Sequence, residues 1–113
     1  MKALDDLTIG EAKQLAAMFN GGGTVDNSAW EIGKAYLIRT VTMIDTGRLI
    51  AVTPHELVLT DAAWVADSGR FADALKTGKL NEVEPFPEGK VIIGRGSVVD
   101  AAEWLHPLPR SQK

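Results

Sequence analysis

Hydrophobic and polar positions repeat with two different periods along this chain. Over residues 7–19 apolar side chains recur at the three- and four-residue spacing of a helix. Thr8 and Glu11 have the spacing of a capping box at the start of this segment, and three glycines at 21–23 follow its end. We therefore expect residues 1–23 to form an N-terminal helix and a flexible glycine linker, appended to the rest of the protein.

From residue 34 onward the pattern changes to short runs of β-branched and apolar residues separated by turn residues, which is typical of strands. The runs predict strands at 34–44, 48–53, 56–60 and 90–93, and a fifth that begins at 97–99. Asp45, Thr46 and Gly47 have the composition of a hairpin turn, in which Gly47 is suited to a positive φ. Pro54 and His55 predict the next turn, so the first three strands should form an antiparallel meander.

One short helix is expected among these strands. Ser68 is placed to cap a helix over 69–76, and Gly78 is placed to end it. The prolines within 84–89 predict a rigid loop. The fold class is therefore α+β: an antiparallel β-meander of four to six strands with one packed short helix and an appended N-terminal helix. The compact domain should span 34–109, with a frayed tail at 110–113.

Composition narrows the class of protein. The chain has 113 residues, no cysteine and a net charge of −3, so disulfides and thiolate zinc sites are excluded. The N-terminus becomes acidic before any apolar run and no stretch is long enough to cross a membrane, which predicts a cytoplasmic protein without a membrane partner. The acidic balance also argues against binding of duplex nucleic acid.

Candidate catalytic residues are few. His55 and His106 each lie beside a proline and lack a third ligand, so neither a metal nor a cofactor is expected. No Gly-x-Ser-x-Gly motif is present. Asp61 and Asp100 both follow strand-like runs and would be an acid–base pair only if folding brought them together. We therefore predict a binding protein with no catalytic residues rather than an enzyme.

Arginines and aromatic residues form the more suggestive set of candidate ligand-binding residues. Stacking on aromatic rings and charge-assisted bonds to phosphate are the means by which proteins hold nucleotides. The candidates are Arg39, Arg48, Trp64, Arg70, Phe71 and Arg95. Structural alternatives remain open: the tryptophans are also suited to the core, Arg39 to an exposed position, and Arg70 to a surface pair with Asp67 or Asp73.

The order of several short motifs resembles a small protein family carried by tailed phages and prophages, whose function is unknown. The motifs cover about two-thirds of the chain and are Ile38-Arg39-Thr40, Gly47-Arg48-Leu49, Glu56 to Leu59, Asp61-Ala62-Ala63-Trp64, Gly69-Arg70-Phe71, Ala74 to Gly78, Val91-Ile92-Ile93 and Asp100 to Trp104. In outline such proteins are similar to phage anti-defence sponges that capture nucleotide immune signals.

This resemblance implies a function and a set of contacts. It implies a homo-oligomer that sequesters a small anionic nucleotide, either a cyclic oligonucleotide or an ADP-ribose-derived messenger, without cleaving it. Arg39, Arg48, Arg70 and Arg95 would contact phosphate, and Trp64 and Phe71 would contact the base or ribose. The alternative is a phage accessory or virion module that docks onto a host or phage protein.

Overall fold

The computed structural model describes residues 29–113. Residues Glu31–Lys113 form one compact unit, which contains all the elements described below. The predicted N-terminal helix and glycine linker lie outside the described residues. The predicted α+β class is confirmed in its coarser sense, because the described unit is a mostly antiparallel sheet with one short α-helix.

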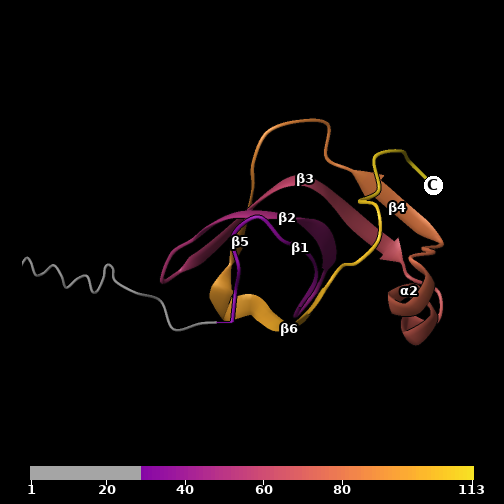
Figure 1. The fold of residues 1–113 in the computed structure, drawn as a ribbon, viewed down its shortest axis with the longest axis horizontal. Helices are drawn as coiled ribbons and strands as arrows, with labels where there is room; N and C mark the ends of the chain where they lie inside the picture. The colour runs from indigo at the N-terminus through magenta and orange to yellow at the C-terminus, as the bar shows by residue number, and fades with distance from the viewer. Residues whose placement is uncertain (1–28) are drawn as a thin grey trace, which may run out of the picture. The chain divides into compact units, whose positions relative to one another are not determined.

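Six strands, one α-helix and one 3-10 helix make up the described unit (Figure 1). In chain order they are β1 (Ala35–Thr40), β2 (Ile44–Val52), β3 (Glu56–Asp67), α2 (Phe71–Thr77), β4 (Glu82–Pro85), β5 (Val91–Gly94), η1 (Arg95–Ser97) and β6 (Val98–Glu103).

The sheet is a meander that the last strand extends on its far side. Strands β1, β2 and β3 pair antiparallel in sequence order, as predicted. The long strand β3 then pairs with β4 along its second half and with β5 along its first half. After η1 the chain returns to the other edge, where β6 pairs antiparallel with β1. The resulting order is β4-β3-β2-β1-β6, so the sheet is more than a simple meander.

The first hairpin turns earlier than the sequence predicted. Thr40 and Met43 close the turn, since the Thr40 amide donates to the Met43 carbonyl at 2.8 Å and the Thr40 hydroxyl accepts the Met43 amide at 2.9 Å. Asp45, Thr46 and Gly47 lie inside β2 and are buried, so their assignment to the turn was wrong. The glycine is needed for close packing instead: a Cβ at Gly47 would lie 3.0 Å from the Leu59 side chain.

Strand β3 runs past its predicted end. It continues through Asp61, whose φ of 50° places it in the left-handed region, and reaches Asp67. The pairing with β2 shifts register over the same stretch. This irregularity turns Trp64 toward the face that carries Leu57 and Leu59, although Trp64 itself is 38% exposed. Strand β4 was missed, because its second half was assigned to the loop at 84–89.

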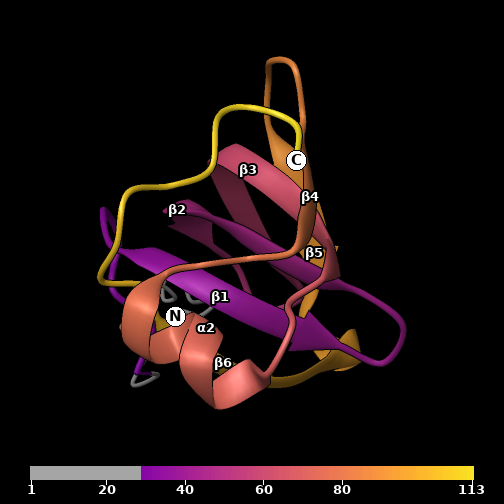
Figure 2. The same ribbon diagram turned by 90° about the vertical axis from the view of Figure 1, so that its right-hand side faces the viewer.

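Both faces of the central strands are buried. On one face a cluster of Leu37, Ala63, Val65, Val83 and Trp104 packs against Ala74 of α2, which Figure 2 shows lying across the sheet near β1. Successive residues of a strand point to opposite faces, so the neighbours of this cluster belong to the other face. There the fully buried residues are Ile38, Leu49, Leu57 and Leu59.

The ends of α2 and the last residues of the chain differ in part from the prediction. Gly78 ends the helix with a φ of 79°, as expected. Ser68 does not cap it, because the N-cap is Arg70, and the Ser68 hydroxyl donates to the Gly69 carbonyl. The tail predicted to fray is held at Lys113, which exchanges two backbone hydrogen bonds with Val83 at 2.9 and 3.0 Å.

Thr46 provides a first test of this packing. Its side chain is fully buried, and its hydroxyl has no hydrogen-bond partner among the described residues. A buried hydroxyl without a partner opposes folding, whereas valine has the same shape without the polar atom. We expect Thr46→Val to raise the free energy of unfolding by about 1 kcal/mol in urea denaturation. A loss of stability would show that the hydroxyl is satisfied.

Candidate functional site

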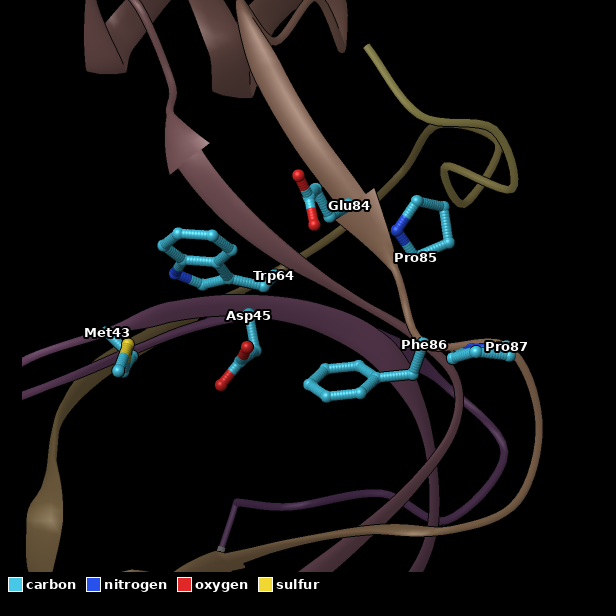
Figure 3. A pocket seen from close by; sticks show the side chains of 7 residues that line it. All are labelled: Met43, Asp45, Trp64, Glu84, Pro85, Phe86 and Pro87. Carbon is cyan, nitrogen blue, oxygen red and sulfur yellow. The ribbon is translucent and has the colours of Figure 1, made fainter.

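A pocket of about 480 Å³ opens where the first hairpin, β3 and the loop after β4 meet (Figure 3). Its walls are mostly apolar. The residues that line this Trp64 pocket are Met43, Asp45, Trp64, Glu84, Pro85, Phe86 and Pro87. Pockets of this size and character are typical of ligand-binding sites. Of the six residues predicted to bind a ligand, only Trp64 lies here.

Strand register places three of the lining residues in one row. Asp45 on β2 pairs with Trp64 on β3, and Trp64 pairs in turn with Glu84 on β4. Directly opposite residues in neighbouring strands point to the same side of the sheet. The indole therefore lies between two carboxyl groups, one on each neighbouring strand.

The wall formed by Pro85, Phe86 and Pro87 is fixed by backbone contacts. Pro85 continues the pairing of β4 with β3, and the Phe86 amide donates to the Ala62 carbonyl at 2.9 Å. The Arg110 guanidinium bridges the two segments, donating to the carbonyls of Ala62 and Phe86 at 3.3 Å each. In Figure 3 the Asp45 side chain is seen between the rings of Trp64 and Phe86. This wall is thus held in place before any ligand arrives.

Asp45 is the unusual member of the pocket. Only 8% of the residue is exposed, and its carboxylate has neither a hydrogen bond nor an ion pair with any described residue. Burial raises the pKa of the Asp45 carboxyl from 3.8 to about 6, because the charged form loses its hydration. At neutral pH the pocket therefore contains a mostly ionised carboxylate that no residue within 29–113 neutralises.

A carboxyl group with a raised pKa in an apolar pocket also suits general acid catalysis. Such a reaction needs further polar groups that orient the substrate and stabilise developing charge. The lining offers Glu84 and the Trp64 indole N–H as its other polar side-chain groups. One indole N–H and two carboxyl groups are therefore the polar side-chain groups that a bound ligand would meet in this pocket.

Arg39 and Phe71 are two predicted site residues that the structure brings into contact. The Arg39 guanidinium lies 4.2 Å from the centre of the Phe71 ring. It also forms a two-point ion pair with Asp100, with Nε donating to Oδ1 at 2.7 Å. These hydrogen bonds lower the pKa of the Asp100 carboxyl. Arg39 thus already has a carboxylate partner and an aromatic partner within the fold.

The remaining arginines lie apart from this contact. Arg48 donates to the Gly33 carbonyl at 2.9 Å, and Arg95 donates to the Thr53 carbonyl at 2.7 Å. Arg70 is exposed and makes no ion pair with Asp67, Asp73 or any other described residue. The four arginines therefore lie on different elements of the described unit, and none of them lines the Trp64 pocket.

The structure also places the histidine and the two carboxylates that were considered as catalytic or metal-binding residues. His106 is half-buried and its Nε2 lies 2.7 Å from the Leu75 carbonyl, which differs from the surface position predicted for it. Asp61 and Asp100 lie on strands that are not neighbours. Within residues 29–113, no group of three histidine or acidic side chains is arranged to hold a metal ion. No helix of the described unit is long and apolar enough to span a bilayer.

Most of the residues that line the pocket were not predicted from the sequence as site residues. Asp45 was wrongly assigned to a turn, and Phe86 was correctly assigned to a loop but not recognised as a wall of the pocket. The sequence did contain one signal, because Asp45 is a single acidic residue after Met43 and Ile44 in an otherwise apolar run. Burying a charged group there costs free energy, so its presence suggests a role other than packing.

The chain matches no protein-family model, and comparisons with curated proteins and with solved structures gave no significant match. The resemblance to phage proteins consequently stays a prediction, and the case for function rests on the site itself.

Proposed function

We propose that this protein is a non-enzymatic interaction module that binds a short segment of a partner protein in the Trp64 pocket. The observation that supports it is the exposure of large apolar side chains around a preformed hollow. Trp64 and Phe86 are each 38% exposed, and Met43 is 49% exposed. Exposed apolar patches with a central pocket mark interaction sites, and aromatic residues dominate the energetics of such sites.

Sequestration of a nucleotide messenger by a homo-oligomer, in the cytoplasm of a phage-infected host, also stays a prediction. The geometry supports it less well. Phosphate would meet Asp45 and Glu84 in the pocket, both of which repel it. Three of the four predicted phosphate contacts, Arg39, Arg48 and Arg95, donate to groups within the fold. These observations favour the protein-interaction module over the nucleotide sponge.

Selection from a random-peptide library tests the proposal. The full chain, immobilised, is used to enrich peptides, and the affinity of each selected peptide is then measured by calorimetry. We expect Trp64→Ala to weaken binding at least 10-fold, equivalent to about 1.4 kcal/mol, because the indole forms the centre of the site.

Ile92→Ala is the matched control for this change. Ile92 is 59% exposed on β5 and does not line the pocket, so its removal should leave peptide affinity unchanged. Selected peptides that bind equally well to the wild type and to Trp64→Ala would refute the proposal. Stabilisation by cyclic dinucleotides, cyclic trinucleotides or ADP-ribose products in a thermal-shift panel would instead support the nucleotide hypothesis.

A further inference from the structure

We propose that the group recognised in the Trp64 pocket is an organic ammonium cation, carried by a lysine or methyl-lysine side chain of the partner segment. This inference rests on the proposed function and names the chemistry of its ligand. It is carried by three features that meet in one place: an unpaired buried carboxylate, two exposed aromatic rings and an apolar wall.

The Asp45 carboxylate favours a positively charged ligand. Asp45 is buried and forms no ion pair with a cation of residues 29–113, and the seven lining residues include neither lysine nor arginine. Glu84, the other charged group facing the pocket, adds to the negative potential from β4. A buried charge without a counterion opposes folding, and a bound cation would relieve that penalty. An anion would increase it.

The aromatic rings of the pocket also favour a positively charged ligand. A cation placed over an aromatic face is attracted by the ring quadrupole, with tryptophan the strongest partner. Trp64 and Phe86 both leave part of their surface open to the pocket. The fold already contains one such contact, between Arg39 and Phe71, so the chain uses this interaction elsewhere.

The apolar wall determines which cations fit. Met43, Pro85 and Pro87 offer hydrocarbon surface and no oxygen ligands from their side chains. A small hydrated metal ion would lose its water without replacement, since six or more oxygen ligands are typical of the common divalent ions. An ammonium group on a hydrocarbon stem retains favourable contacts along its whole length, and methyl groups on the nitrogen lower its cost of dehydration.

Three small probes of equal length test the inference on the full chain: N-acetyl-lysine amide, its Nε-trimethyl derivative, and a neutral analogue in which a tert-butyl group replaces trimethylammonium. Binding is followed by titration in NMR spectra at pH 7.5. We expect the trimethylated probe to bind at least 10-fold more tightly than the neutral analogue, because only the cation interacts with the carboxylate and the ring faces.

Two variants identify the groups responsible. Asp45→Asn should reduce affinity for the trimethylated probe at least 10-fold and reduce the difference between the cation and its neutral analogue. Glu82→Gln, an exposed acidic residue of β4 that does not line the pocket, is the control and should change nothing. Wild-type affinity for the cation should also fall as the pH is lowered from 7.5 to 5, since protonation removes the charge on Asp45.

The outcomes separate the two proposals. Equal binding of the cation and the neutral analogue would overturn the ammonium assignment, while selected peptides that depend on Trp64 would leave the interaction module standing. Cation binding that is unaffected by Asp45→Asn and by Trp64→Leu, with both variants shown to be folded by thermal melting, would place the cation elsewhere and overturn the assignment. Absence of cation binding and of selected peptides would refute both.

Discussion

Replacing Asp45 by asparagine is expected to stabilise the folded protein at pH 7.5 by about 1–2 kcal/mol. The pKa of this carboxyl rises from 3.8 to about 6 on folding. A shift of this size corresponds to about 3 kcal/mol of preference for the protonated form. Asparagine removes the charge but leaves a buried amide, and burial of this amide offsets about 1–2 kcal/mol of the stabilisation.

The pH dependence of this effect has a definite sign. Because the carboxyl binds its proton more tightly in the folded state, its penalty is absent below about pH 4, grows as the pH rises toward 6, and is complete above that value. Urea denaturation of both proteins at pH 4.5 and 7.5 measures it. The stability advantage of Asp45→Asn should be present at pH 7.5 and lost at pH 4.5, where the remaining charge penalty no longer exceeds the cost of the buried amide. An equal difference at both values would show that the Asp45 carboxyl does not titrate abnormally.

The same substitution should weaken ligand binding. A residue whose removal stabilises the fold and abolishes binding is retained for function, since selection for stability alone would replace it. Higher stability together with weaker ligand binding would distinguish Asp45 from Thr46. Removing the Thr46 hydroxyl, which has no partner among the described residues, should affect stability alone.

Replacing Gly78 by alanine is expected to destabilise the protein by about 2–4 kcal/mol, the largest loss predicted here. Two effects contribute. The φ of 79° at the end of α2 is unfavourable for any residue with a Cβ, at about 1–2 kcal/mol. In addition, that Cβ would lie 2.6 Å from His106 Cγ and 2.8 Å from His106 Cβ, so the imidazole must move. Displacing it breaks the contact with the Leu75 carbonyl and disturbs the packing on Trp104, whose ring centre is 4.9 Å away.

Gly89→Ala is the matched control for this prediction. Gly89 has a φ of 90°, but a Cβ there would meet no atom within 4 Å. It therefore experiences the backbone strain without the collision, and we expect a loss of about 1 kcal/mol. Chemical denaturation of the two variants measures the difference. Equal losses would show that the His106 ring yields without cost and that only the backbone strain matters.

The parts of the fold that were predictable from sequence are those determined by local chemistry. The order of strands from β1 to β3, the turn at Pro54 and His55, the helix end at Gly78 and strand β5 all follow from β-branched runs and from glycine or proline at the ends of elements. These features depend on neighbouring residues, so a single sequence contains the information needed to find them.

The first hairpin and the site depended on contacts between distant segments. Asp45, Thr46 and Gly47 have good local turn chemistry, yet tight packing of Gly47 against Leu59 and Ala62 keeps them in β2 and moves the turn to Met43. The left-handed conformation of Asp61 lies within a β3 that continues to Trp64, a local irregularity that composition does not reveal.

For this protein the sequence by itself determined a small acidic α+β domain without cysteine and the approximate positions of most strands. Only the tertiary structure decided which carboxyl group is buried in an apolar pocket. Pairing of β2, β3 and β4 brings Asp45 and Glu84 to either side of Trp64, and the backbone bond from Phe86 to Ala62 closes the wall. The pKa of a carboxyl and the preference of a pocket for cations depend on burial and on neighbours across strands. Those neighbours are separated by tens of residues in the chain and meet only when the sheet has formed.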